Sequence, residues 1–293
     1  MDGRVIDAPY WLRKFLVQGI ILNTRPKKSA AAYKKIWWDE GSPLVVISER
    51  LKDKLQAKID EPVALGMRYG NPSIKAGIEE LLSKEAGIKE ILLIPLYPHY
   101  AMSSYETVVV KAEEIIKAYF PNLKMAVKAP FFDEKNYLKA LSDSIKPYIK
   151  PDTDHVLFSY HGIPERHVKK SDTTKCHCLK TSHIVAETLG IPRDKYTICF
   201  QSRLGPDPWL KPSTTDTLED MGKKGVKNLV IICPAFVADC LETIEEIGME
   251  GKELFLEAGG ESFVMVPCLN DNDSWVNVLA GYIAESKVTP SHV

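Results

Sequence analysis

Short apolar runs rich in β-branched residues alternate along this chain with segments of helical periodicity, and this alternation limits the possible folds most. The runs predict strands at residues 62–68, 90–97, 124–131, 155–160, 196–201, 228–234 and 262–267. Most are continuous Val, Ile and Leu stretches, which is typical of strands buried on both faces of a parallel sheet. The sequence therefore predicts an α/β fold built from doubly wound parallel sheets.

The segments between these strands carry the residues that begin and end helices. We expect helices at residues 43–59, 73–82, 103–120, 136–149, 181–189 and 216–221. Ser73 is a natural N-cap, and Gly190 directly follows a predicted helix. The segment that starts at Pro43 contains the strand-like run LVVIS, but Ser42 as a cap with proline at the first helical position favours a helix there.

Residues 150–154 are typical of a junction between two α/β units. We expect a first Rossmann-like half at residues 1–132 together with 273–293, and a second half at residues 133–272. The first half then holds fewer of the predicted strands than the second. The chain also opens with helix-like sequence, which is unusual for a doubly wound unit.

Composition excludes several classes of protein. The net charge is −1 and the pI is about 6.7, so attraction to nucleic acid or anionic lipid would have to come from local patches. The longest apolar runs are too short to span a bilayer, and charged residues interrupt the first 22 positions, which argues against a signal peptide. Six cysteines in 293 residues are too few for a disulfide scaffold and favour a reduced, cytoplasmic setting. The GxGxxG, GxxxxGK[ST], GxSxG and HExxH patterns are absent.

The motif SYHGIP places His161 at the carboxyl end of a predicted buried strand. Ligands of open α/β sheets bind beyond the carboxyl ends of the strands. A neutral imidazole there can accept a proton or bind a divalent cation near pH 7. The alternative is a hydrogen-bonded histidine in a strand–loop corner.

An acidic series follows the sixth predicted strand. Asp239 is a natural N-cap, and Glu242 lies three residues further on. In an α-helix, Glu242, Glu246 and Glu250 would share one face at i, i+4 and i+8 spacing. The series is either a solvated acidic face at a helix N-terminus or, together with His161, a site for a divalent metal in transit.

Three further loops after predicted strands combine aromatic with hydrogen-bonding side chains. They contain Arg68, then Tyr97 and Tyr100, and then Arg203 and Trp209. Such loops suit a large planar, acidic ligand, with Trp209 as a flat wall and Arg203 paired to a carboxylate. Ordinary packed loops are the alternative.

The motif formed by Cys176, His177 and Cys178 raises the question of a metal centre. However, C-x-C is not the usual C-x-x-C spacing, and no second cysteine pair lies close in sequence. The other cysteines stand at or near strand ends and are typical of core thiols. We therefore expect no structural metal and no [2Fe-2S] cluster.

Together these segments strongly resemble the ferrochelatase family, whose members insert ferrous iron into a porphyrin at the end of haem synthesis. The resemblance covers nearly the whole chain. It rests on GMRYG at 66–70, LYPHY at 96–100, SYHGIP at 159–164, QSR at 201–203 with PWL at 208–210, and DCLETIEE at 239–246. It implies two Rossmann-like halves with a porphyrin cleft between them.

The resemblance also implies roles for matching positions. His161 would face the macrocycle as a metal ligand or pyrrole proton acceptor, with Glu242 across the cleft. Glu246 and Glu250 would continue an acidic path for iron or departing protons, and Asp239 would support the helix cap. The porphyrin pocket would be shaped by Arg68, Tyr97, Tyr100 and Trp209.

The implied substrates are Fe²⁺ and a porphyrin, protoporphyrin IX before coproporphyrin, without an organic cofactor. We expect no nucleic-acid partner and a monomer or homodimer, and a peripheral membrane contact stays open. Two other functions also stay open. One is a related chelatase that inserts cobalt or nickel into a reduced tetrapyrrole, which the QSR and PWL motifs disfavour. The other is a porphyrin- or haem-binding protein without catalysis.

The sequence departs from the family pattern at two places. Cys240 stands where many members have a histidine. Family members also usually begin with a strand and a Gly-containing loop at the cleft, and this chain starts downstream of that pattern. We therefore expect the first strand of the first half to be missing, with a loss of stability and activity.

Overall fold

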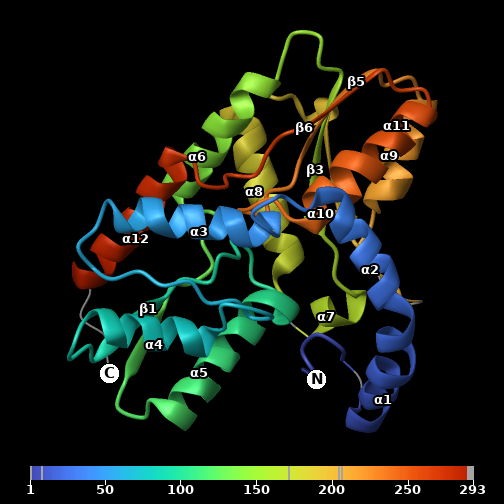
Figure 1. Ribbon diagram of the computed structural model, residues 1–293. Coiled ribbons are helices and arrows are strands. Elements are labelled where there is room, and N and C mark those ends of the chain that lie inside the picture. Colours follow the sequence, from blue (N-terminus) through green and yellow to red (C-terminus); the bar gives the residue numbers. More distant parts are fainter. Residues whose placement is uncertain (1, 8, 171, 204, 206, 289–293) are drawn as a thin grey trace.

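The larger sheet has four parallel strands in the order β4-β3-β5-β6 and lies in the upper half of the view in Figure 1. The computed structural model describes residues 2–7, 9–170, 172–203, 205 and 207–288. A second parallel sheet pairs β1 with β2. The strands are β1 Glu90–Leu93, β2 Lys124–Val127, β3 His155–His161, β4 Tyr196–Gln201, β5 Asn228–Ile232 and β6 Ser262–Met265. The predicted α/β class with parallel sheets is confirmed.

Helices connect the strands and cover the sheets. The α-helices are α1 Tyr10–Phe15, α2 Leu22–Ile36, α3 Pro43–Gln56, α4 Ile74–Lys84, α5 Thr107–Tyr119, α6 Lys135–Ile145, α7 Glu165–Lys169, α8 Thr174–Thr188, α9 Thr214–Lys223, α10 Leu241–Ile244, α11 Lys252–Glu257 and α12 Asp273–Val288. Short π-helical segments are η1 Leu16–Ile21, η2 Met102–Glu106 and η5 Glu246–Gly251, and 3₁₀ turns are η3 Lys146–Tyr148 and η4 Arg193–Lys195.

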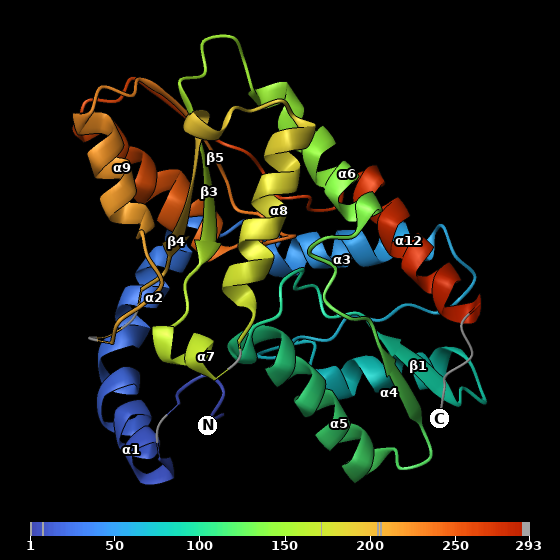
Figure 2. The same cartoon turned by 180° about the vertical axis from the view of Figure 1, so that it is seen from behind.

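The four-stranded sheet is buried on both faces (Figures 1 and 2). Phe158 and Tyr160 of β3 belong to a core cluster that includes side chains of α6 and α8. Leu157, which points the other way, belongs to a second cluster with side chains of α9 and α11. Because successive strand residues face opposite sides, burial on both faces requires the continuous apolar runs seen in the sequence.

The predicted strand at residues 62–68 is wrong, because this segment joins neither sheet ladder. Side chains partner its peptide groups instead. The Val63 N–H donates to Oε1 of Gln56, and the Val63 carbonyl accepts from Nζ of Lys84. The segment also lies tightly on α4, where a Cβ at Gly77 would stand 2.7 Å from the carbonyl oxygen of Leu65. The strands β1 and β2 are also shorter than expected, and end at Leu93 and Val127.

The ambiguous segment after Ser42 is a helix, as predicted, with Pro43 in its first turn. Ser73 caps α4 through a hydrogen bond from the Ala76 N–H to its Oγ. Helix α8 starts seven residues before its predicted start, at Thr174, and so contains the C-x-C motif. No helix within the described ranges is long and apolar enough to cross a bilayer.

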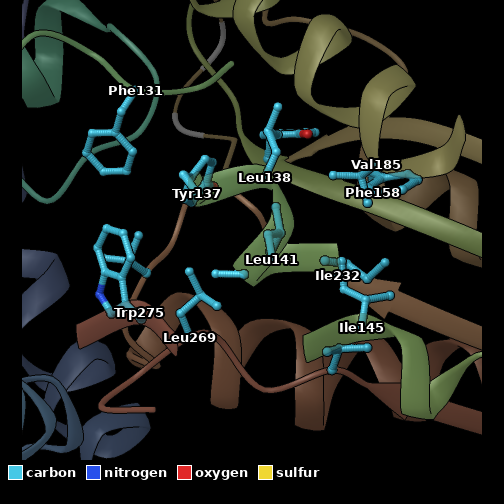
Figure 3. Close-up of a cluster of buried hydrophobic side chains, with 14 of the residues drawn as sticks. Phe131, Tyr137, Leu138, Leu141, Ile145, Phe158, Val185, Ile232, Leu269 and Trp275 are labelled. Atoms are coloured by element: carbon cyan, nitrogen blue, oxygen red, sulfur yellow. The ribbon is translucent and has the colours of Figure 1, made fainter. Parts of the chain in front are cut away.

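Helix α12 packs against α3 and α6 and completes the larger core cluster. Its Trp275 is fully buried, with its ring 5.6 Å from Phe131 and 6.1 Å from Tyr137 between ring centroids (Figure 3). Through this cluster, α12 therefore packs against residues on both sides of position 132, where the first predicted half was expected to pass into the second. The boundaries of the two halves stay a prediction.

Candidate active site

His161 ends β3, and its side chain is exposed at the carboxyl edge of the four-stranded sheet. Its Nδ1 lies 2.7 Å from the carbonyl oxygen of Gly162. Because a carbonyl only accepts, Nδ1 carries the proton and Nε2 carries the lone pair of the neutral ring. The ring lies near two aromatic side chains, with centroids 6.4 Å from Trp209 and 6.5 Å from Phe236. His161 is thus oriented as a proton acceptor or metal ligand through Nε2.

Gly162 allows this strand end to approach its neighbours closely. Its N–H donates to the carbonyl oxygen of Gln201 at 2.8 Å. A Cβ at this position would stand 3.0 Å from that same oxygen and 3.2 Å from the Trp209 ring. A larger residue after His161 would therefore displace Trp209 or open the contact between β3 and β4.

Gln201 links the edge of the sheet to the acidic segment. It stands opposite His161 in the β3–β4 register, and its side chain is buried. Its Oε1 accepts from the Ser159 hydroxyl at 2.7 Å, and its Nε2 donates to the backbone carbonyl of Glu242 at 2.6 Å. Because both ends of this amide are used, Gln201 fixes the start of α10 relative to His161.

Ser202 holds the carboxylate of Glu246. Its N–H donates to Oε1 at 2.7 Å and its hydroxyl donates to Oε2 at 2.6 Å. The φ of Ser202 is 64°, in the left-handed region that non-glycine residues rarely adopt. Backbone strain of this kind persists where surrounding contacts fix it, and it concentrates at functional sites.

The predicted N-cap at Asp239 is wrong, because Cys240 occupies the N-cap position of α10. Asp239 supports the turn instead, as the resemblance implied. Its buried carboxylate accepts hydrogen bonds from the Thr243 hydroxyl at 2.9 Å, the Cys268 N–H at 3.2 Å and Nδ2 of Asn270 at 2.7 Å. Thr243 in turn accepts from the Cys240 N–H at 3.0 Å. The loop after β5 is therefore held by a closed network of buried hydrogen bonds.

The acidic series does not continue along one regular α-helix, because α10 gives way to the π-helix η5. The Glu250 N–H bonds to the Glu245 carbonyl five residues back. The pKa of Glu250 is raised by partial burial and then by the neighbouring Glu245 carboxylate. The buried Glu245 also pairs with Nζ of Lys35 on α2 at 2.5 Å. The wider turn of the π-helix thus brings the carboxylates of Glu245 and Glu250 together. The sequence analysis assumed α-helical i+4 spacing and therefore missed Glu245.

Side chains from other parts of the chain lie near Glu242. Burial, followed by nearby groups that include the Glu242 carboxylate, raises the pKa of Tyr97 and of Tyr33. The pKa of the Cys240 thiol is raised by burial and then by Glu242, which keeps the thiol protonated near pH 7. Tyr97 follows β1, and Tyr33 stands on α2. Sequence reasoning missed Tyr33, because no local pattern connects α2 to residues more than 200 positions later.

Arg68 lies beside this group, and its charge acts on Tyr97. The guanidinium stands 4.5 Å from the centre of the Tyr69 ring. It donates from Nε to the Thr107 carbonyl at 3.1 Å and from Nη2 to Asp2 at 3.2 Å. Arg68 and Glu242 thus both act on Tyr97, and the place of Arg68 and Tyr97 in a porphyrin pocket stays a prediction.

Tyr100 is held by a different set of contacts. Its hydroxyl donates to Glu106 at 2.5 Å, and Glu106 pairs with Arg4 at 2.8 Å. Its backbone N–H donates to Nδ1 of His177, whose ring is stacked on Phe132 with centroids 3.6 Å apart. Within the part of the chain that the structure describes, these contacts of Tyr100 do not reach His161 or Glu242, so its place in a porphyrin pocket stays a prediction.

The cysteine motif contributes one exposed thiol, Cys176, and one buried thiol, Cys178. Over the residues that the structure describes, no three His, Cys, Asp or Glu side chains are grouped so as to hold a metal ion. His161, Glu242, Glu246 and Glu250 therefore do not form a ready-made ligand cage. His161 lies at the carboxyl edge of the sheet, Glu242 lies on α10, and Glu246 and Glu250 lie on η5.

Comparison with known proteins gives consistent results. A family model described as Ferrochelatase matches residues 1–287. The proteins named Ferrochelatase from Pseudomonas fluorescens (strain Pf0-1) and Pseudomonas entomophila (strain L48) are 45% and 44% identical. Each alignment covers 96% of this chain, and 88% and 90% of the two relatives.

Two solved structures resemble the fold. SirB from Bacillus subtilis with Fe³⁺ has a TM-score of 0.59 at 17% identity, and the match covers 82% of this chain and 88% of SirB. DR2241 from Deinococcus radiodurans, a multi-domain protein with similarity to chelatases, has a TM-score of 0.51 at 10% identity over 84% of this chain and 53% of its own. At these identities the likeness concerns the fold.

Proposed function

The chain belongs to the ferrochelatase family, and we propose that His161 is the residue that accepts pyrrole protons during its reaction. As a ferrochelatase it inserts Fe²⁺ into a porphyrin in haem biosynthesis. Ferrous iron and the porphyrin are its substrates. The roles of individual residues given below are proposals.

Insertion exchanges two pyrrole N–H protons for one Fe²⁺ ion, so both protons must leave the ring. The observation that carries the proposal is the state of His161, whose Nδ1 proton is committed to the Gly162 carbonyl while Nε2 keeps its lone pair. Nε2 can therefore take a proton from a pyrrole nitrogen as the ion enters. Its exposed position at the end of β3 leaves it open to a planar substrate.

Glu242 is proposed as the partner of His161. A carboxylate near the site stabilises the imidazolium that forms and can pass the proton onward. Gln201 positions it, because this side chain bonds the Glu242 carbonyl and belongs to the residue directly opposite His161. The neighbouring Tyr97 and Tyr33 limit the access of water to the carboxylate.

Glu246 and Glu250 are proposed as the continuation of this path, for Fe²⁺ or for departing protons. Each Glu246 oxygen accepts one hydrogen bond from Ser202 and keeps a second lone pair. Glu250 is exposed, and its raised pKa makes proton exchange with solvent easier than for an ordinary glutamate. Oxygen ligands of this type suit a divalent cation in transit better than a permanent site.

The porphyrin pocket is proposed to use Trp209 against one side of the ring and Tyr97 against the other. Trp209 lies beside His161 and Tyr97 lies near Glu242, so they accompany the two proposed catalytic groups. Arg68 would bind a propionate of the substrate, in competition with Asp2. Tyr100, held by Glu106, is proposed at the margin of the pocket. We propose protoporphyrin IX as the porphyrin.

The test is anaerobic iron insertion with protoporphyrin IX and with coproporphyrin III, measured for the wild type and for His161→Ala. General acid–base catalysis contributes about 10²–10⁴-fold, so the variant should lose about that factor in kcat. His183→Ala removes another exposed histidine, on α8, and should keep wild-type turnover. Turnover within twofold of wild type in a folded His161→Ala protein would remove this residue from the mechanism. Faster insertion into coproporphyrin III would replace the proposed substrate.

A further inference from the structure

The outer edge of β2 carries peptide groups that the smaller sheet does not use. The N–H groups of Lys124 and Lys128 donate to carbonyl groups at either end of β1, both at 2.9 Å. Because successive peptide groups of a strand point to opposite edges, those of Met125 and Val127 point away from β1. In the part of the chain that the structure describes, this sheet ends at β2. Such an edge is a template for pairing with another strand.

A cavity of about 340 Å³ lies beside this edge, between β2 and α5. Its lining combines apolar side chains with one acidic and one basic residue: Ile116, Pro121, Met125, Val127, Glu113 and Lys117. Glu113 and Lys117 are exposed and stand four residues apart on α5, so they share a face. The ion pair on α5 joins Lys111 to Glu114 instead, so among the described residues Glu113 and Lys117 have no charged partner.

We propose that β2 pairs in antiparallel fashion with β2 of a second copy of this chain, about a twofold axis at Ala126. In that register Met125 of one copy stands opposite Val127 of the other, and their outward N–H and carbonyl groups exchange two hydrogen bonds on each side of the axis. The two small sheets become one continuous sheet. A twofold contact needs a self-complementary surface, and two outward-facing residues placed symmetrically about one alanine provide it.

The charges on α5 fit the same axis. Helix α5 connects the parallel strands β1 and β2, so it runs opposite to β2, the green arrow that follows it in Figure 2. Ile115 stands four residues before the end of α5, about 6 Å along the helix. Ala126 stands two residues after the start of β2, about 7 Å along the strand. Both therefore lie at a similar height above the turn at 120–123, and the axis places Glu113 of each copy opposite Lys117 of the other.

The opposite face of β2 limits the strength of this pairing. There, Lys124 of one copy stands opposite Lys128 of the other, and like charges facing each other weaken a strand pair. The Lys128 ammonium is already paired with Glu134 and lies 4.0 Å from the centre of the Tyr282 ring, which reduces the repulsion. The strand is short and the attractive charges are exposed, so the dimer should dissociate on dilution and at high salt.

Cysteine crosslinking of the full chain tests the register. In Ala126→Cys the two new thiols meet at the axis, where the Cα atoms of a non-hydrogen-bonded antiparallel pair lie about 4.5 Å apart, within reach of a disulfide. We expect a covalent dimer on a non-reducing gel after oxidation with copper phenanthroline. Lys124→Cys is the matched control, because its two copies stand about 13 Å apart along the strands and should not crosslink. The wild type gives the background from the exposed Cys176. Equal crosslinking of both variants, or none with Ala126→Cys, would overturn the proposal.

Charge reversal, followed by sedimentation equilibrium, tests the contact between the two α5 helices. Lys117→Glu turns two attractive contacts into two repulsive ones and should raise the dissociation constant of the dimer about tenfold. Glu113→Lys/Lys117→Glu puts opposite charges back across the axis and should restore the wild-type constant. Lys223→Glu, which breaks an exposed ion pair on α9, should leave it unchanged.

None of these residues belongs to the proposed catalytic groups, so the outcome is independent of the proposed function. A wild-type chain that stays monomeric under the crosslinking conditions would overturn the proposal. A dimer that the double variant fails to restore would also overturn it, because another surface or another partner would then occupy this edge.

Discussion

The two regions that contribute to the site are held in different ways. On the side of the four-stranded sheet, Gln201 and Asp239 are buried and hydrogen-bonded. Strand register sets the position of Gln201, and bonds to Thr243, Cys268 and Asn270 hold Asp239 in the loop after β5. On the other side, Arg68 and Tyr100 stand on loops and are held by partly exposed ion pairs that involve the N-terminal residues Asp2 and Arg4.

This difference has a physical consequence. A buried hydrogen-bond network costs much to break, because each lost partner leaves an unsatisfied group away from water. A partly exposed ion pair contributes little and is screened by salt. We therefore expect substitutions on the sheet side to change stability and turnover strongly, and those on the loop side to change mainly substrate affinity.

The largest effect is expected for Asp239→Ala. The change leaves the Thr243 hydroxyl, the Cys268 N–H and Nδ2 of Asn270 without their common acceptor. It should lower the free energy of unfolding by about 3–5 kcal/mol, measured by urea denaturation. Asp220→Ala removes an exposed carboxylate and should cost less than about 0.5 kcal/mol. Similar losses in the two variants would contradict the comparison.

Gln201→Leu should come next, because it breaks the link between the β4 edge and α10. We expect a loss of about 2 kcal/mol in stability and a fall of about 10–100-fold in kcat, since misplaced catalytic groups lose that factor. Ser159→Ala is the control. It removes the hydrogen bond to Oε1 of Gln201 but leaves the bond from Nε2 to the Glu242 carbonyl. If both variants lose kcat equally, Gln201 acts through general packing and not by positioning Glu242.

On the sheet side, sequence alone predicted the strand end at which His161 lies. His161 was predicted because a continuous apolar run must be a buried strand, and the end of such a strand faces ligands. Arg68 and Tyr97 were singled out in loops after predicted strands, and the resemblance implied their place in the porphyrin pocket. The start of α3 followed from Ser42 and Pro43, and the start of α4 followed from Ser73. Each of these inferences depends on local sequence.

The features that were missed depend on contacts between distant parts of the chain. In the π-helix η5, Glu250 pairs with the residue five positions back, Glu245, and not with Glu246 four positions back. Glu245 also forms an ion pair with Lys35 of α2. Cys240 and not Asp239 is the N-cap of α10. The Asp239 carboxylate instead accepts hydrogen bonds from Cys268 and Asn270, about 30 residues later. Residues 62–68 form no ladder, and side chains of α3 and α4 bond the N–H and the carbonyl of Val63 instead. None of these contacts has a local signature.

A third prediction concerns His99, which stands at the junction of the two regions. Its Nε2 lies 2.9 Å from the Thr181 hydroxyl, which itself donates to the Phe132 carbonyl. Nε2 therefore carries the proton, and the buried Nδ1 has no hydrogen-bond partner. Protonation would bury an unpaired charge, so burial, helped by the nearby His177, lowers the pKa of His99 from 6.5 to about 3.

Stability should therefore fall as the pH is lowered below 6.5. Between pH 6.5 and about 3 the unfolded chain binds a proton at this residue and the folded chain does not. The loss should approach about 1.4 kcal/mol for each pH unit in that window, and the contribution is fully present above pH 6.5. His99→Gln should have a flatter stability profile between pH 6.5 and 5. A profile with the wild-type slope would mean that other groups cause the acid sensitivity.

The smallest effects are expected on the loop side, at the pair formed by Asp2 and Arg68. Their charged groups lie 3.2 Å apart, and each side chain is 15% exposed. Asp2→Asn should cost at most about 1 kcal/mol, because Arg68 keeps its bond to the Thr107 carbonyl and its place over the Tyr69 ring. The cost should shrink further as salt is added.

The same variant sharpens the comparison when insertion is measured. If Arg68 binds a porphyrin propionate, Asp2→Asn removes a competing carboxylate and should lower the KM for porphyrin, whereas Arg68→Ala should raise it, by up to about tenfold. Neither change should alter kcat by more than about twofold, because both residues affect binding and not proton transfer. A large fall in kcat for either variant would show that the loop side positions the reacting groups as firmly as the sheet side. The contrast between the two regions would then be wrong.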